Sequence, residues 1–236
     1  VLYIKTGKLL RHYSVGEGRN SLKSNFIYCI SKIDDTDIMI GTTRGAYLFN
    51  QKQNDFSLLP GMPLNIWYTT LLKDDKDIIW AGTYGNGIIY YDTRTRLSRN
   101  LRYDAVKKNS LGSDRVNSIF EAKNNTLWFA TEDGLCRLNR AGNDFTGYTT
   151  KNGFPSNLIL SILEDDSSNL WISTSKGLVC FDPQTEQLIT YTLINGTLSD
   201  QFNFSSAYKD NDGRMYFGSV KGLISFHPDE FSKNKF

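Results

Sequence analysis

The segment NLWISTSKGLVCFDP at residues 169–183 decides the fold, because a near copy of it, TLWFATEDGLCRLNR, occupies residues 126–140, 43 residues earlier. Three further copies carry the same features in the same order: an apolar–aromatic pair, a small residue, Thr or Ser, a turn that ends in Gly, and an alternating apolar run. These copies are DIMIGTTRGAYLFN (37–50), IIWAGTYGNGIIYYD (78–92) and RMYFGSVKGLISFHP (214–228). Self-similarity at a fixed spacing is the signature of a repeat architecture.

Two positions within the copies keep the same spacing. The turn glycines are Gly45, Gly87, Gly134, Gly177 and Gly222, with steps of 42, 47, 43 and 45 residues. The bulky positions are Met39, Trp80, Trp128, Trp171 and Tyr216, with steps of 41, 48, 43 and 45 residues. The sequence therefore contains one repeating unit of about 44 residues.

Each unit reads as four short strands separated by turn-forming residues. In the unit that contains Trp171, apolar strands at 157–165, 169–174, 177–182 and 187–192 are divided by an acidic turn, a Gly turn and Pro183. A lone four-stranded meander would leave an apolar face and two edges exposed, whereas several arranged around an axis bury those faces. The sequence therefore predicts an all-β fold, a β-propeller of four-stranded blades with Trp80, Trp128 and Trp171 packed between blades.

The predicted propeller is incomplete. We expect four full blades, at 25–59, 65–104, 114–150 and 157–192, three strands of a last blade at 203–228, and the end of an earlier blade at 1–13. Both ends of the chain supply a third strand, although a closed ring usually joins complementary strands. We therefore expect a partial propeller over residues 1–236, with an apolar face at each broken end that favours self-association.

Composition and motifs argue against several function classes. The net charge is +2 with mixed signs throughout, which gives no electrostatic case for nucleic acid or an anionic membrane surface. No apolar run approaches the roughly 18 residues of a spanning helix. Neither His12 nor His227 has a nearby Cys or His at metal-ligand spacing, and no nucleophile or phosphate-binding motif is present. Recurring acidic pairs such as Asp74–Asp75 are interpreted as turn formers. We expect no catalytic site, no metal and no cofactor.

The three cysteines, Cys29, Cys136 and Cys180, are odd in number and fall one per unit. When the repeats are aligned, Cys136 matches Val179 and Cys180 matches Arg137. The two cysteines should therefore point to opposite faces of their blades. A disulfide between them is not expected, and all three are interpreted as buried or half-buried core residues.

A second recurring element indicates a binding face. An apolar residue, small or variable residues and then Asn or Asp precede each unit: LKSN (22–25), MPLN (62–65), LGSD (111–114), FPSN (154–157) and a shortened LSD (198–200). In a propeller this loop and the turn between the second and third strands emerge on one face, around the channel mouth. The turns there also carry Glu132 and Asp133. The predicted ligand-binding residues are Arg44, Trp67, Tyr84, Asn86, Arg115, Asn117, Lys176, Gln201, Asn203 and Lys221. The alternative is that they are solvated loop tips.

The residues also carry a family resemblance. The sequences FPSN, SILED, NLWISTSKGL and the following FDP resemble the regulator-propeller repeat of hybrid two-component sensors of gut Bacteroidetes. The segment LSDQFNFSSAYKDNDGRMYFGSVKGLISFHPDEF (198–231) resembles the last blade of the second propeller in that family. Met39, in place of a usual Trp, the longer turn at 84–87 and the longer connection at 99–114 depart from the family pattern.

The resemblance implies a periplasmic sensor module from the C-terminal part of a seven-bladed propeller. In such proteins the propeller region precedes a membrane span and a cytoplasmic histidine kinase, neither of which is in this sequence. The implied ligand is an oligosaccharide released from a glycan, and the implied assembly is a dimer. The alternative function is a propeller scaffold for protein–protein interaction without a small-molecule site. An enzyme is the least favoured class, because the sequence lacks converging titratable groups.

Overall fold

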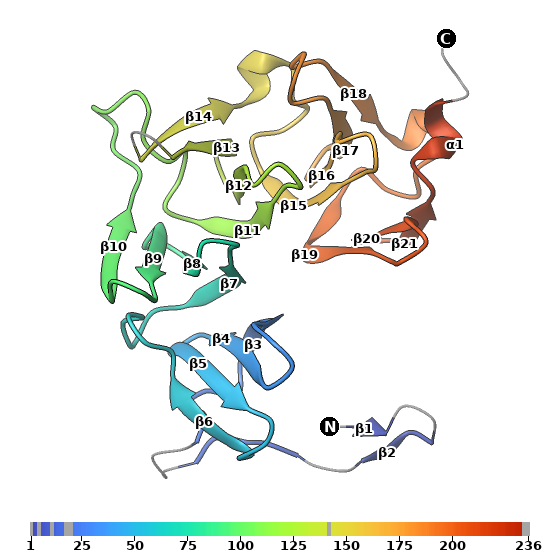
Figure 1. Ribbon diagram of the computed structural model, residues 1–236. Coiled ribbons are helices and arrows are strands. Elements are labelled where there is room, and N and C mark those ends of the chain that lie inside the picture. Colours follow the sequence, from blue (N-terminus) through green and yellow to red (C-terminus); the bar gives the residue numbers. More distant parts are fainter. Residues whose placement is uncertain (1, 4–5, 10–11, 17–20, 141–142, 233–236) are drawn as a thin grey trace.

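The computed structural model in Figure 1 describes residues 2–3, 6–9, 12–16, 21–140 and 143–232, and its regular secondary structure consists almost wholly of antiparallel strands. Among the described residues, four sheets have four strands each, one sheet has three and one, near the N-terminus, has two. Within each sheet the spatial order of the strands follows their order in the chain, so every sheet is an up-and-down meander. In Figure 1 the sheets follow one another from the blue first blade to the red last blade. The predicted all-β propeller architecture is confirmed.

The strands have the following bounds. The first blade comprises β3 (Ile27–Lys32), β4 (Asp37–Thr42), β5 (Gly45–Asn50) and β6 (Asp55–Leu58). The second comprises β7 (Tyr68–Lys73), β8 (Ile78–Thr83), β9 (Ile88–Asp92) and β10 (Leu97–Leu101). The third comprises β11 (Val116–Glu121), β12 (Leu127–Thr131), β13 (Gly134–Asn139) and β14 (Asp144–Tyr148). The fourth comprises β15 (Ile159–Glu164), β16 (Leu170–Thr174), β17 (Gly177–Phe181) and β18 (Leu188–Tyr191), and the fifth β19 (Phe202–Lys209), β20 (Met215–Ser219) and β21 (Gly222–Phe226).

Shorter elements flank these blades. Near the N-terminus β1 (Leu2–Tyr3) pairs with β2 (Lys8–Leu9). The blade end predicted at 1–13 covers this pair, but its residues 1, 4–5 and 10–11 lie outside the described part of the chain. After the last strand, the four-residue helix α1 (Asp229–Ser232) places Phe231 against Trp171, with ring centroids 5.3 Å apart.

The large aromatic residues of the repeat pack between blades, as predicted. Trp80 of the second blade lies 5.8 Å from Phe129 of the third, and Trp128 of the third lies 6.0 Å from Phe181 of the fourth, measured between ring centroids. Trp171 contacts Phe226 of the fifth blade at 4.7 Å. Trp80, Trp128 and Trp171 occupy the same position of the repeat, and each buries its side chain against the following blade. The need to fill the space between blades therefore explains both the repeat period and the hydrophobic core.

The first strand of each blade faces the middle of the molecule. The strands β3, β7, β11, β15 and β19 contact one another in that order. Side chains connect them: Asn117 Nδ2 on β11 donates to the carbonyl of Ile159 on β15 at 2.7 Å, and Ser205 Oγ on β19 donates to the carbonyl of Asn117 at 3.2 Å. These five strands therefore line the central channel.

The three cysteines are free, and Cys136 is buried while Cys29 and Cys180 are half-buried. Burial raises the pKa of the Cys29 thiol to about 12 and that of Cys136 to about 11. Thiols with such pKa values hold little thiolate at neutral pH and are poor nucleophiles. The cysteines are core residues, as the sequence indicated.

Candidate functional site at the channel mouth

The repeated Thr and Gly build the turn between the second and third strands of each blade. In the fourth blade, Thr174 Oγ1 donates to the carbonyl of Gly177 at 2.8 Å and accepts from the amide of Lys176 at 3.0 Å. Gly177 has φ of +129°, and a Cβ there would lie 2.9 Å from the carbonyl oxygen of Tyr191. Both the dihedral and the close approach therefore require glycine.

The Asn or Asp that precedes each blade ties it to the turn of the blade before. The carbonyl of Asn157 accepts from the amide of Gly134 at 2.7 Å, and the carbonyl of Asp200 accepts from the amide of Gly177 at 2.7 Å. The Asn157 side chain also donates to Asp133 at 2.7 Å. The loop and the turn thus meet at the channel mouth. The hydrogen bonds of the loop Asn or Asp connect the two segments, which is a structural role.

A β-bulge marks the mouth end of each inner strand. The register with the second strand shifts between Ile27 and Cys29, between Tyr68 and Thr70, and between Val116 and Ser118, and likewise in the two later blades. The bulged positions in the first three blades are Tyr28, Thr69 and Asn117. Bulges re-aim side chains and are over-represented near functional sites.

Aromatic side chains form a continuous row across the mouth of the first two blades. The ring centroids of Tyr28 and Trp67 are 4.7 Å apart, and those of Trp67 and Tyr84 are 4.5 Å apart. The row ends at Arg115, whose guanidinium carbon lies 4.5 Å from the Tyr84 ring centroid and whose Nη1 is 3.0 Å from Glu132 Oε2. This row connects three blades.

A cavity of about 270 Å³ lies against this row. It is mainly apolar, and its lining residues are Tyr28, Trp67, Thr69, Tyr84, Asn117, Glu132, Phe204 and Ser205. We name it the mouth pocket. Among the described residues, the indole Nε1 of Trp67 is buried and has no hydrogen-bond acceptor. Buried polar groups are almost always paired, so this unpaired donor on a residue that lines the pocket is unusual.

A second cavity, of about 300 Å³, continues along the channel between the inner strands. It shares Tyr28, Thr69 and Ser205 with the mouth pocket, and the hydroxyls of Ser118 and Ser161 also line it. Within the described residues, Ser161 Oγ is buried without a partner. The channel below the pocket is therefore lined by hydroxyl groups as well as by apolar side chains.

The structure brings four of the ten predicted site residues together. Trp67, Tyr84 and Asn117 line the mouth pocket, and Arg115 lies over Tyr84. The remaining predicted residues lie outside the two sets that line these cavities: Arg44, Lys176 and Lys221 are exposed in turns, Asn86 is half-buried in a turn, and Gln201 and Asn203 are exposed at the start of the fifth blade. Of the other pocket residues, Glu132 lies in one of the turns noted from the sequence, whereas Tyr28, Thr69, Phe204 and Ser205 were not anticipated.

Three carboxylates gather on the opposite side of the blades, at the turn between first and second strands. Oxygen atoms of Asp74, Asp75 and Glu121 lie within 4.8 Å of one another. Arg140 Nη1 is 3.2 Å from Asp74, and its Nη2 is 3.4 Å from Glu121. Burial, and then the nearby Asp74 and Asp75, raise the pKa of Glu121. With Asp74 also accepting from Trp80, the group is an ion-pair network between the second and third blades.

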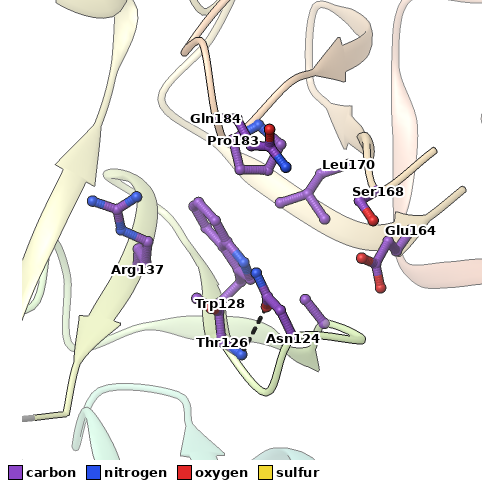
Figure 2. A pocket seen from close by; sticks show the side chains of 10 residues that line it. Asn124, Thr126, Trp128, Arg137, Glu164, Ser168, Leu170, Pro183 and Gln184 are labelled. Atoms are coloured by element: carbon purple, nitrogen blue, oxygen red, sulfur yellow. Dashed lines mark hydrogen bonds between the residues drawn. The ribbon is translucent and has the colours of Figure 1, made fainter.

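A smaller cavity of about 90 Å³ lies beside Trp128, between the third and fourth blades (Figure 2). Figure 2 shows Arg137 on one side of the indole and Leu170 and Glu164 on the other. Ala122 lines this cavity at the position that Asp74 and Asp165 occupy in other blades. The missing carboxylate explains the space.

Comparisons with known proteins agree with this architecture. Residues 110–133 and 153–176 match the family described as two component regulator propeller. Histidine kinase P4 of Formosa agariphila is 28% identical over 130 residues, which cover 52% of this chain and 9% of that protein.

Solved structures give the same picture. The extracellular domain of the hybrid two component system BT3049 from B. thetaiotaomicron is 26% identical with a TM-score of 0.76, covering 89% of this chain and 29% of that one. The corresponding domain of BT4673 is 26% identical with a TM-score of 0.73, covering 93% and 28%. Virginiamycin B lyase from Staphylococcus aureus, 13% identical with a TM-score of 0.66 and coverage of 92% and 74%, shares the fold alone.

The chain thus spans less than a third of these sensor relatives. Over the residues that the structure describes, none of the helices has the length and apolar character to cross a membrane. Residues 110–133 and 153–176 thus match the two component regulator propeller repeat, and the chain as a whole is similar in fold and sequence to the extracellular domains of hybrid two component systems.

Proposed function

We propose that this chain is part of the periplasmic sensor region of a hybrid two-component protein, and that it binds an oligosaccharide released from a glycan at the mouth pocket. The signal would pass to a cytoplasmic histidine kinase outside this sequence, and the blades would belong to a seven-bladed propeller. In this proposal the chain itself has no catalytic role.

The observation that carries the proposal is the aromatic mouth pocket, which is lined by Trp67, a residue whose buried indole N–H has no partner among the described residues. A sugar hydroxyl oxygen would accept from it, and the aromatic rings of Tyr28 and Tyr84, both partly exposed, would pack against the apolar face of a sugar ring. The cavity has room for about one sugar ring, and the hydroxyl-lined channel below it could take more of the ligand.

A thermal-shift screen against neutral and acidic oligosaccharides from plant and host glycans tests the site. A ligand at about a hundred times its Kd stabilises the folded state by roughly 2.7 kcal/mol. We expect a shift in the wild type that is lost in Trp67→Phe, which keeps a ring but removes the N–H. Trp128→Phe makes the same exchange away from the pocket and should keep the shift. A shift that survives Trp67→Phe would place the ligand elsewhere.

The second candidate function is a propeller scaffold that binds a protein partner. The observation in its favour is the apolar surface of the first and last blades: Phe26 and Ile30 beside or on β3 are 70% and 67% exposed, and Tyr208 on β19 is 63% exposed. Large apolar side chains that are exposed to this extent are available to a protein partner. We propose that a second copy of the chain covers the β3 surface in a homo-oligomer.

A further inference from the structure

Glu132 is the charged residue of the mouth pocket. Of the eight residues that line the cavity, it is the one with an ionisable carboxylate, and none of the eight is a Lys, Arg or His. Arg115 lies at the rim, outside the lining set. Its guanidinium is held from two sides, by Glu132 at 3.0 Å and by the Tyr84 ring at 4.5 Å.

This arrangement leaves a negatively charged ligand without a free cation in the pocket. A carboxylate or sulfate group that entered would approach Glu132, and like charges at close distance repel even near a protein surface. The charge of Arg115 is already balanced by Glu132, so it attracts an entering anion less than an unpaired cation would.

An uncharged ligand with hydroxyl groups meets complementary partners instead. A hydroxyl can donate to the Glu132 carboxylate and can also hydrogen-bond to the polar side chains of Thr69, Asn117 and Ser205, which line the same pocket. We propose that the mouth pocket selects uncharged, hydroxyl-bearing ligands and rejects acidic ones, and that Glu132 sets this selectivity. The inference rests on the proposed function, because it concerns the same pocket.

Oligosaccharide pairs that differ in charge alone test the selectivity. Suitable probes are trigalacturonate and its full methyl ester, and a glucuronate-substituted xylo-oligosaccharide and its carboxyl-reduced form, titrated by calorimetry at low salt and at 150 mM salt. We expect the neutral member of a bound pair to bind at least about tenfold more tightly than the acidic one, with a smaller ratio at high salt.

Two variants should change the affinity for the acidic ligand in opposite directions. Glu132→Gln removes the carboxylate and leaves the Arg115 guanidinium without its ion-pair partner. The affinity for the acidic probe should therefore rise at least about tenfold, while the affinity for the neutral probe should change little. Arg115→Ala leaves the Glu132 carboxylate unpaired and should weaken the binding of the acidic probe further. Glu186→Gln is the matched control: Glu186 lies in the β17–β18 turn, accepts from Tyr148 at 2.8 Å, and should leave both affinities unchanged.

The outcomes separate this inference from the proposed function. If the acidic probe binds the wild type as tightly as the neutral one, or if Glu132→Gln leaves its affinity unchanged, the selectivity is overturned while Trp67-dependent binding stands. If no oligosaccharide in the screen binds wild type or Glu132→Gln, the proposed function fails and the selectivity fails with it.

Discussion

Trp171 donates its indole N–H to Asp165 at 3.0 Å, and this pair joins the core of a blade to the turn between its first two strands. Asp165 also accepts from the backbone amides of Ser167 and Asn169. The same arrangement recurs as Trp80 with Asp74 at 2.9 Å. The acidic residue before the second strand of the second and fourth blades is thus a buried turn cap that also positions the tryptophan of the repeat.

Replacing Asp165 by Ala should destabilise the protein by about 2–4 kcal/mol, because it leaves the Trp171 N–H and two turn amides without their acceptor in a buried place. Chemical denaturation followed by tryptophan fluorescence measures the loss. The neighbouring Asp166, whose side chain is 76% exposed, is the control, and Asp166→Ala should cost much less. Equal losses for the two variants would contradict the assigned role of Asp165.

The third blade lacks this cap, and restoring it should stabilise the fold. Ala122 has the same turn hydrogen bonds as Asp74, since its amide donates to Thr126 and its carbonyl accepts from Asn125, but it offers no side-chain acceptor beside Trp128. Ala122→Asn should fill part of the 90 Å³ cavity and add about 0.5–1.5 kcal/mol to the free energy of unfolding. Ala122→Asp should gain less, because buried Glu164 lines the same cavity. Urea denaturation of the two variants ranks them.

Asp166 should give the stability a dependence on acid pH. Hydrogen bonds from Lys209 and Lys123 lower the pKa of its carboxyl to about 2, below the ordinary value of about 3.9. A lowered folded-state pKa contributes stability that is fully present above the unfolded value and is lost as the pH falls through about 2. Urea midpoints measured between pH 5 and pH 2 should therefore fall less steeply for Asp166→Asn than for the wild type. Parallel curves would show that the two lysines do not hold the carboxylate in solution.

The sequence predicted the blade architecture because the same residues perform the same task in each unit. Trp80, Trp128 and Trp171 fill the space between successive blades, and the Thr and Gly of each mouth turn meet fixed geometric demands. A requirement that repeats along the chain leaves a periodic trace in it. The loops that precede each blade were also correctly predicted to lie at the same face as these turns.

The composition of the mouth pocket was harder to predict, because it depends on which residue of a turn faces the channel. In each turn the first residue extends the pairing with the inner strand: the amide of Tyr84 donates to the carbonyl of Trp67, and that of Glu132 to Arg115. Arg44, Lys176 and Lys221 are the second residues of their turns and are exposed to solvent. The β-bulge that directs Thr69 into the pocket also could not be predicted from the sequence.

Gly177 should be intolerant of any side chain. A Cβ there would lie 2.9 Å from the Tyr191 carbonyl oxygen, and φ is +129°, so Gly177→Ala should destabilise the protein by about 1–3 kcal/mol. Gly147 on β14 has open space around its Cβ position, and Gly147→Ala should be neutral or slightly stabilising. Thermal denaturation of both variants makes the comparison. A fully stable Gly177→Ala protein would contradict the turn geometry at the channel mouth.

The apolar surface at β3 should drive self-association of the protein in solution. Phe26 and Ile30 expose 70% and 67% of their surface there, whereas the later inner strands β7, β11, β15 and β19 each lie against the inner strand of the preceding blade. Ile30→Lys places a charge in this surface and should shift the protein toward monomer in sedimentation velocity at a fixed concentration. Ile189→Lys alters another exposed isoleucine, 59% exposed on the outer strand β18, and should leave the distribution unchanged. A wild-type protein that sediments as a compact monomer at high concentration would refute the proposed association, because the first blade would then be stable in water without a partner on its inner strand.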